Sequence, residues 1–218
     1  MSFDAGLDAA KKPSAPQRVG EIARNVYPTD LIRDVTTTTG LTLHLRPIRP
    51  DDAGQLVAFH ERLSPGAVYR RYFSWHPELS AEEVNRYTNV DYVDRLALIV
   101  TDGDDLVAVG RYDRLPKSCD AEVAFLVADE YQHQGIGLLL LHNLAGAARG
   151  RGITSFSAET QADNRNMMNV FRESGFHVIT SIEDEILSVR FSIEPDEPDH
   201  ARDKLEEVAH GADHDEGT

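Results

Sequence analysis

Short stretches of alternating apolar and polar residues predict most of the strands of this chain. Leu41, Leu43 and Leu45 alternate with polar residues, which is the two-residue period of a half-buried strand. The apolar runs at 96–100 and 106–110 are separated by the sequence Thr-Asp-Gly-Asp-Asp, so they predict a hairpin. Further strands are expected at residues 121–127, 153–159, 176–181 and 185–193.

Other segments carry apolar residues at helical spacing and begin with residues that cap helices. Asp51 or Asp52 is expected to cap a first helix, and Ser64 followed by Pro65 opens a second helix that runs through Tyr72. The remaining predicted helices are a short one from the capping box of Ser80 and Glu83 to about Tyr87, a long one after Gly135 that ends at Gly150 or Gly152, and one from Asn164 to Ser174 that Gly175 ends.

The order of these elements predicts one domain with a tail at each end. Residues 1–35 contain three prolines and few apolar residues, so we expect a loosely ordered N-terminal arm. Residues 36–194 hold the predicted strands and helices and form the expected domain. Residues 195–218 are expected to be a disordered acidic tail. A chain of 218 residues is long enough for one such domain and too short for two.

Composition and charge narrow the classes of function. The formal net charge is −15. Residues 194–218 contribute −8 of it, because they contain ten acidic and two basic residues, and the rest of the chain carries −7. Nucleic-acid binding depends on Lys and Arg that neutralise phosphates, so no nucleic-acid partner is expected. The chain has no run of about 18 apolar residues and its start lacks the apolar core of a signal peptide. We therefore expect no membrane association and a cytoplasmic location.

The cysteine and histidine content gives no reason to expect a metal. Cys119 is the only cysteine, so no intrachain disulfide and no cysteine-based metal site can form within one chain. It lies in a predicted loop, where we do not expect it to act as a nucleophile. The tail histidines His200, His210 and His214 are too widely spaced to predict a site.

The stretch from residue 121 to residue 152 combines an apolar strand, a turn with two glycines and an apolar helix. Gly135 and Gly137 let the backbone turn sharply and approach a ligand without a Cβ in the way. The free amides and the positive dipole end of the following helix are suited to an anion. The turn lacks the Lys-Ser or Lys-Thr of a P-loop and the third glycine of a dinucleotide fingerprint. From these residues alone, phosphate binding is one interpretation among several.

Two successive motifs in the chain resemble those of the GNAT superfamily of N-acetyltransferases. The first is similar to the Gln-x-x-Gly-x-Gly loop that wraps the pyrophosphate of CoA, and consists of Gln132, His133, Gln134, Gly135, Ile136 and Gly137. The second follows the next strand and consists of Asn164, Met167, Val170, Phe171, Gly175 and Phe176. The resemblance spans residues 42–193. It implies the GNAT fold, a mixed α/β (α+β) domain with a mostly antiparallel twisted sheet of about seven strands and four or five helices.

The resemblance also implies acetyl-CoA as co-substrate and assigns residues to its binding. The loop residues expected to contact it are Gln132, His133, Gln134, Gly135, Ile136, Gly137 and Leu138. The backbone of Leu126 and Val127 would pair with the pantetheine arm like an extra strand, and Asn164 would contact the same arm. The family usually holds the oxyanion with a backbone amide of this strand, so Val127 is also the candidate for that role. His133 stands where GNAT proteins often carry glycine, and no catalytic role is expected for it.

Phe171 is a cofactor-binding position where this chain departs from the family pattern. Many GNAT enzymes carry a tyrosine here that is thought to protonate the leaving thiolate, and phenylalanine has no proton to give. Two explanations stay open, because either a different acid serves or the CoA thiolate leaves unaided.

Glu122 is the candidate general base because it interrupts an apolar strand. A buried carboxyl has a raised pKa, which suits it to take a proton from an ammonium group, although a solvent-facing position on the strand explains the pattern equally well. The segment Ala-Glu-Val-Ala at residues 121–124 resembles the strand of the actinobacterial protein lysine acetyltransferases, whose glutamate is taken as the general base. His60 on the first helix is a second candidate, because histidine titrates near neutral pH and could relay a proton through Glu122. A lone helical histidine is also commonly a plain surface residue.

The resemblance favours a protein lysine side chain as the acceptor, with acyl-CoA synthetases as the proteins that carry it. Two other interpretations stay open: an acetyltransferase for a small amine, which an acidic cleft would attract equally well, and a non-catalytic acyl-CoA sensor. The related catalytic domains are often fused to a sensing domain, for which this chain has no room. The last strands leave a free sheet edge, so a monomer or a homodimer is expected.

Overall fold

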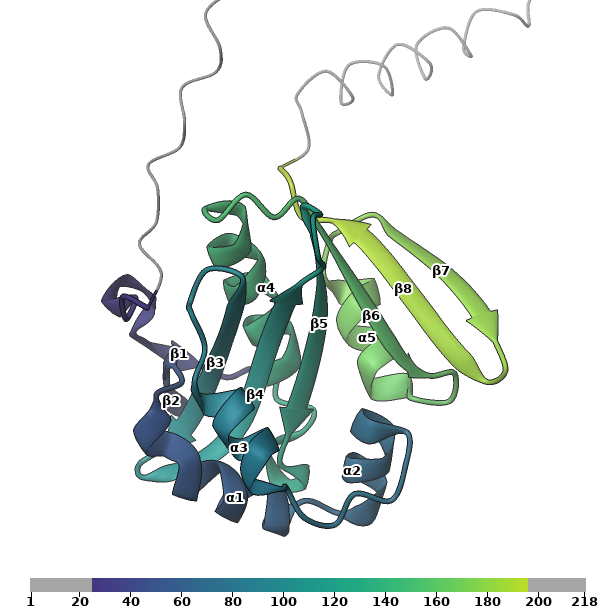
Figure 1. The fold of residues 1–218 in the computed structure, drawn as a ribbon. Coiled ribbons are helices and arrows are strands. Elements are labelled where there is room, and N and C mark those ends of the chain that lie inside the picture. The colour runs from purple at the N-terminus through teal and green to yellow at the C-terminus, as the bar shows by residue number, and fades with distance from the viewer. Residues whose placement is uncertain (1–24, 196–218) are drawn as a thin grey trace, which may run out of the picture.

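The computed structural model describes residues 25–195, which form one eight-stranded sheet with helices on both faces (Figure 1). The strands are β1 (Arg33–Thr36), β2 (Thr42–Pro47), β3 (Arg95–Asp102), β4 (Asp105–Arg114), β5 (Asp120–Val127), β6 (Ser155–Gln161), β7 (Val178–Glu183) and β8 (Ile186–Ser192). Their order in the sheet is β1-β2-β3-β4-β5-β6-β8-β7, and all neighbours are antiparallel except β5 and β6. The mixed, mostly antiparallel sheet expected from the sequence is confirmed.

The helices divide between the two faces of the sheet. In Figure 1, α1 (Ala53–Arg62), α2 (Pro65–Tyr72) and α3 (Ala81–Thr88) lie in front of the sheet, and α4 (Ile136–Arg149) and α5 (Arg165–Glu173) lie behind it. Short 3-10 helices occur at η1 (Thr29–Leu31), η2 (Pro50–Asp52) and η3 (Asp129–Tyr131). Across residues 25–195, no helix has both the length and the apolar character needed to cross a bilayer.

The sheet has one strand more than expected, because β1 pairs with β2. Three of its four residues are exposed, so it lacks the apolar alternation by which a strand is detected in sequence. A tight turn forms the pair instead: the Thr37 amide donates to the Leu41 carbonyl at 2.9 Å, and the Gly40 amide donates to the Thr37 carbonyl at 3.0 Å. β1 thus crosses the expected boundary between arm and domain at residue 35, while residues 1–24 and 196–218 of the two expected tails lie outside the described residues.

Side-chain caps begin α2 and α3 as the sequence predicts. The Ser64 hydroxyl accepts a hydrogen bond from the Ala67 amide at 3.2 Å, with Pro65 as the first residue of α2. At α3, the Glu83 amide donates to the Ser80 hydroxyl at 3.2 Å, and the Ser80 amide donates to the Glu83 carboxylate at 2.9 Å. Both caps are complete within four residues of sequence.

The predicted cap of α1 by Asp51 or Asp52 is wrong. Asp52 precedes α1 but makes no side-chain cap. Its buried carboxylate accepts two hydrogen bonds from the Arg46 guanidinium, both at 2.7 Å, and one from the Arg49 amide, also at 2.7 Å. A bidentate guanidinium contact is stronger than a neutral cap, so the carboxylate ties the end of β2 to the start of α1.

Two hydrophobic cores lie on opposite faces of the sheet. One packs α4 and α5 against the strands and includes Leu140, Leu144, Phe156 and Phe191. The other packs α1 and α2 against the middle strands and contains no residue of β6, β7 or β8. The front helices therefore cover only part of their face.

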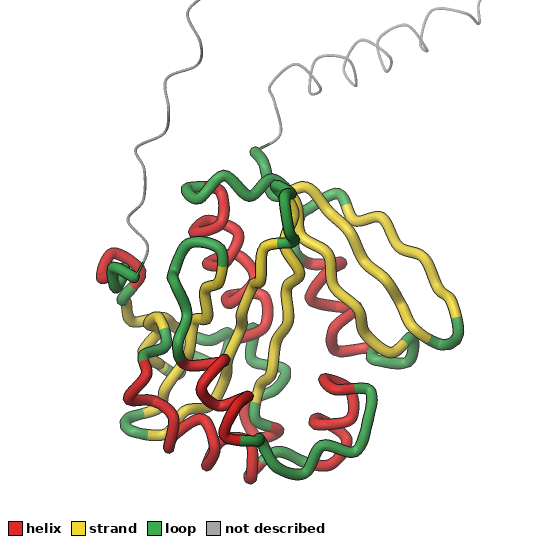
Figure 2. Tube along the Cα trace, viewed as in Figure 1, coloured by secondary structure: helices red, strands yellow, loops and turns green. Residues whose placement is uncertain are grey.

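β5 and β6 are joined over only three residue pairs, between residues 120–122 and 155–157. Beyond this point they diverge, as the strands in Figure 2 show, while β5 stays paired with β4 through Val127 and β6 stays paired with β8 through Gln161. The divergence opens the sheet and leaves one edge of β5 without a neighbouring strand.

Candidate active site

A cavity of about 430 Å³ lies where β5 and β6 separate. Residues 122–127 of β5 and 158–160 of β6 form two of its walls, and residues from α2, α4 and α5 complete it. Its volume falls in the range of small-molecule sites, roughly 300–1,000 Å³.

The backbone of β5 presents polar groups to this cavity at alternate residues. The Ala128 amide donates to the Val107 carbonyl at 2.9 Å, which sets the hydrogen-bonded pairs between β4 and β5. By the antiparallel alternation, the amide and carbonyl of Leu126 then point toward β4, whereas those of Phe125 and Val127 point toward the open side. Val127 is therefore well placed for the backbone role expected of it, and Leu126 offers its side chain rather than its backbone.

The glycine turn at the end of β5 has the backbone shape that the sequence predicts. Gly135 has a φ of 80°, and a Cβ there would lie 3.0 Å from the Cγ2 of Thr38. A Cβ on Gly137 would lie 3.0 Å from the Cγ2 of Val170, so this glycine lets α4 and α5 approach closely. Within residues 25–195, the amides of residues 136–138 find no acceptor, and they stand at the positive end of a 14-residue helix. This geometry suits an anion.

Two glutamines brace the turn. Gln132 donates from its amide nitrogen to the Val127 carbonyl at 3.2 Å and accepts from Asn166 at 3.0 Å, so it links β5 to α5. Gln134 faces the other way, since its carbonyl accepts from the Thr38 amide at 3.1 Å and its side chain contacts Thr39 and Glu130. Gln134 does not line the cavity. Gln134 therefore holds the turn against the β1–β2 connection and does not form part of the cavity wall.

Asn164 and Phe171 lie on the α5 wall of the cavity. Asn164 caps α5, because its side-chain oxygen accepts from the Met167 amide at 3.2 Å and its nitrogen donates to the Thr160 hydroxyl at 2.8 Å. Phe171 is 3% exposed and packs against Phe191, with ring centroids 5.7 Å apart. Its ring fills the position where the family tyrosine is expected and belongs to the core.

Glu122 lines the same cavity and is exposed, not buried. The sequence allowed either a buried carboxyl or a solvent-facing position, and the structure shows the solvent-facing position. Among the described residues, no ion pair engages its carboxylate. The side chain is free to turn toward the cavity.

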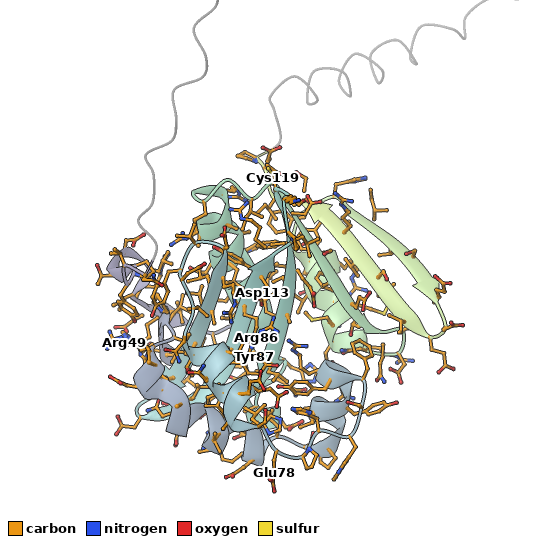
Figure 3. The ribbon with its side chains drawn as sticks, in the orientation of Figure 1. Arg49, Glu78, Arg86, Tyr87, Asp113 and Cys119 are labelled. Atoms are coloured by element: carbon orange, nitrogen blue, oxygen red, sulfur yellow. The ribbon has the colours of Figure 1, made fainter. Side chains whose placement is uncertain are left out.

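The β4 side of Glu122 is occupied by charged and aromatic groups. Asp113 is the cross-strand partner of Glu122 and accepts a hydrogen bond from Arg95 at 3.0 Å. The guanidinium of Arg86 lies 3.8 Å from the same Asp113 carboxylate (Figure 3). The neighbouring Arg111 is buried with its guanidinium carbon 3.7 Å from the centroid of the Tyr87 ring. Burial lowers the pKa of Arg111 to about 10. These groups close the surface between β4 and α3.

The structure does not bring His60 to the cavity. The residue is 3% exposed, and its ring centroid lies 5.8 Å from those of both Tyr72 and His76. Neither ring nitrogen has a hydrogen-bond partner among residues 25–195. Burial and the nearby His76 lower the pKa of His60, so the ring is held neutral. His60 is thus a buried core histidine rather than a surface residue.

Most of the residues predicted for the site share this one cavity. Those that line it are Glu122, Leu126, Val127, Gln132, His133, Gly135, Ile136, Gly137, Leu138, Asn164 and Phe171. Gln134 and His60 do not.

Several lining residues have no signal in the sequence. Thr38 comes from the connection after β1, Phe73 follows α2 in a left-handed conformation with a φ of 56°, and Glu159 stands on β6. Arg70 and Arg71 of α2 also line the cavity. Tertiary packing alone brings Thr38, Phe73 and Glu159 together, so spacing along the chain could not reveal them, whereas positive charge already marks Arg70 and Arg71 as candidates for contact with CoA phosphates or an acidic substrate patch.

Cys119 lies away from the cavity, and His200, His210 and His214 lie outside the described residues. Cys119 is exposed in the loop before β5, at the opposite end of the molecule from Glu78 (Figure 3). Among residues 25–195, no group of three or more His, Cys, Asp or Glu side chains is arranged to hold a metal ion.

Comparisons with known proteins place the chain in a family. Residues 64–176 match the model of the acetyltransferase (GNAT) family. The chain is 31% identical over 144 residues to acetyltransferase Pat of Mycolicibacterium smegmatis. The aligned region is 65% of this chain and 43% of that protein. The chain therefore matches less than half of the length of this relative.

Solved structures agree with this match. The GNAT domain of S. lividans PAT superposes with a TM-score of 0.73 at 39% identity, covering 77% of this chain and 99% of that one. A cAMP-binding acyltransferase from Mycobacterium smegmatis superposes with a TM-score of 0.55 at 26% identity, covering 75% of this chain and 48% of that one. The chain therefore belongs to the acetyltransferase (GNAT) family.

Proposed function

We propose that this enzyme transfers the acetyl group of acetyl-CoA to the side-chain amine of a protein lysine by direct attack. One observation supports this most strongly. A single strand, β5, carries Glu122 at one end of the cavity and leads into the glycine turn at the other. Cofactor binding and proton removal would therefore be served by one rigid element, which fixes the distance between them.

The cavity fits an acyl-CoA. The amides of residues 136–138 and the positive end of α4 would hold the pyrophosphate, and Gly135 leaves room for its close approach. Phe125 would present its backbone amide and carbonyl, and Val127 its amide, to the pantetheine arm. Arg70 and Arg71 line the same cavity and supply positive charge for the remaining phosphate. Bound acetyl-CoA supplies the activated acetyl thioester.

Two groups of the chain serve the transfer step. Glu122 takes the proton that the lysine ammonium must lose, which frees the nitrogen lone pair to attack. The Val127 amide donates a hydrogen bond to the oxygen that becomes negative as the C–N bond forms. The C–S bond then breaks and CoA departs as a thiolate, since the buried Phe171 ring has no proton to donate.

A protein lysine is the proposed acceptor for two reasons. The strand around Glu122 resembles that of the actinobacterial protein lysine acetyltransferases, and the S. lividans PAT domain is 39% identical to this chain. The exposed carboxylates Glu122 and Glu159 at the cavity also favour a cationic acceptor. Acyl-CoA synthetases are the first proteins to test.

The test is a transfer assay with radiolabelled acetyl-CoA against a panel of acyl-CoA synthetases and small amines. We expect label on a lysine of at least one protein, located by mass spectrometry, and little label on the amines. Labelling of small amines alone would replace the proposal with a small-molecule acetyltransferase. Tight CoA binding without transfer to any acceptor would instead favour a sensor.

A further inference from the structure

We propose that a groove on the uncovered sheet face of β6, β8 and β7 binds the polypeptide that flanks the acceptor lysine. This inference rests on the proposed protein-lysine activity and assigns it a docking surface. A groove of about 300 Å³ lies on this face, with Glu122 at its inner end and Ile179 of β7 on its outer wall.

The alternation of side chains leaves this face polar and open. Phe156, Ala158, Val189 and Phe191 are buried in the core against α4 and α5. The residues between them point the opposite way, toward the side of α1, α2 and α3. Because the core under those helices includes no residue of β6, β7 or β8, and no helix lies in front of β8 and β7 in Figure 1, this part of the face has no cover among the described residues.

The groove is continuous with the acetyl-CoA cavity. Glu122, Ala158 and Glu159 line both. Glu122 pairs with Ser157, and Glu159 follows two residues later on the same face of the diverging β6. Ideal strand geometry would put the Cα atoms of Glu122 and Glu159 about 8 Å apart, and the divergence widens this gap. A lysine side chain lying in the groove could therefore pass between the two carboxylates to the thioester.

Other side chains crowd the remaining approaches to Glu122. On the β4 side, Asp113 is held by Arg95, and the adjacent Arg111 is buried against Tyr87. At the far end, α2 packs against β5 and β6. The groove on the β6–β8–β7 face therefore gives an acceptor too large to enter the cavity an open approach to Glu122.

The chemistry of the groove suits an extended, lysine-bearing segment. Its two carboxylates match one ammonium group, and Arg190 does not oppose them because its guanidinium is paired with Asp120 at 2.8 Å. Ser157 and Ser188 offer hydroxyl groups for the peptide backbone. Ile179 is 64% exposed and gives an apolar contact for a residue beside the lysine.

Two variants test the groove with a library of lysine-containing peptides as acceptors. Glu159→Gln removes one carboxylate, and Ser188→Trp fills the floor where Ser188 pairs with Glu159 across the strands. We expect Glu159→Gln to raise the KM for the best peptide about tenfold through the loss of one charge-assisted contact, and Ser188→Trp to raise it at least tenfold by blocking the groove. The KM for acetyl-CoA should change less than twofold.

Matched controls make the same replacements outside the groove. Glu183→Gln changes an exposed carboxylate on β7, and Ser192→Trp adds the same ring to the end of β8. Both should keep the wild-type KM for the peptide. Circular dichroism melts of all four variants identify any loss of folding.

The possible results separate the groove from the proposed function. If folded Glu159→Gln and Ser188→Trp both keep the wild-type KM for peptides that the wild type acetylates, the groove is overturned and the lysine activity stands. If the controls weaken peptide binding as much as the groove variants, the groove is likewise overturned. If the wild type acetylates small amines but no peptide and no protein, the proposed function is overturned and the groove with it.

Discussion

Glu122 of β5 pairs with Ser157 of β6 at the last position where the two strands are joined. The carboxylate therefore stands at the apex of the opening in the sheet, where the acetyl-CoA cavity and the groove on β6, β8 and β7 meet. This one relationship places the candidate base where the proposed cofactor site and the proposed acceptor groove meet.

Replacing Glu122 with Gln keeps the size of the side chain and removes the proton acceptor. We expect kcat to fall by about 10²–10⁴-fold, the usual contribution of general base catalysis. The Kd for acetyl-CoA, measured by calorimetry, should stay unchanged because the glycine turn is intact. Glu183→Gln, on an exposed carboxylate of β7, is the control and should keep the wild-type kcat. Equal activity of the two variants would remove Glu122 as the base.

Replacing Gly135 with Glu should abolish CoA binding. Any side chain there is strained, since φ is 80° and a Cβ would lie 3.0 Å from Thr38, so Gly135→Ala should itself cost about 1–2 kcal/mol of stability. Gly135→Glu adds a negative charge where the pyrophosphate is expected and should weaken CoA binding at least tenfold more than Gly135→Ala does, as measured by calorimetry.

Gly146→Glu is the control, because it adds the same charge to the same helix at an exposed position with open space around it. It should leave the Kd for CoA within twofold of the wild-type value. Wild-type affinity of a folded Gly135→Glu variant would contradict the placement of the pyrophosphate at this turn.

The pair of Arg46 and Asp52 should make stability depend on acid pH. Burial raises the pKa of Asp52, but the hydrogen bonds from Arg46 and the Arg49 amide outweigh it, so the pKa lies below its ordinary value. The unfolded carboxyl, with a pKa of about 3.9, then takes up protons first as the pH falls. The stabilisation is present above that pH and is lost as the pH falls through the lower folded pKa.

Asp52→Ala should therefore lose about 3–5 kcal/mol at pH 7 by leaving the Arg46 guanidinium unpaired. Its unfolding free energy, from urea titrations, should also fall less steeply than that of the wild type below about pH 4. Asp51→Ala, at the exposed neighbouring carboxylate, should change stability by less than about 0.5 kcal/mol. A parallel pH dependence of Asp52→Ala and wild type would refute this account.

His60 should contribute a second pH dependence, nearer neutrality. Its pKa is lowered in the folded state by burial and by His76, so below the unfolded pKa of about 6.5 the unfolded chain binds the extra proton. Stability should fall as the pH drops below that value and level off below the folded pKa. His60→Leu, which fills the site with an apolar side chain, should flatten this region of the stability curve.

Ala58→Leu is the control, since it adds the same side chain at an exposed position of the same helix, removes no titratable group and should leave that slope unchanged. Urea titrations between pH 5 and pH 7.5 are the measurement. A His60→Leu slope equal to that of the wild type would show that the His60 ring takes up its proton without opposing the folded state.

Local features of the fold were predictable because the interactions that stabilise them join residues only a few positions apart. The caps of α2 and α3 join Ser64 to Ala67 and Ser80 to Glu83, and the Gly135 turn needs only a left-handed backbone angle. The same argument failed at Asp52, which bonds Arg46 six residues away instead of its own helix. A longer-range, stronger contact outcompeted the local cap.

The sequence by itself determined the glycine turn, the strand that bears Glu122, most of the helix boundaries and the family, because these depend on residue type and short spacing. Only the tertiary structure decided that β5 and β6 separate after Glu122, that His60 is buried and that Glu159 joins the site. The separation of the strands and the position of Glu159 depend on the pairing of segments more than thirty residues apart, between residues 120–122 and 155–157, and the burial of His60 depends on its packing beside Tyr72 and His76. Such pairings are set by packing and hydrogen bonding over the whole sheet, which no local pattern encodes.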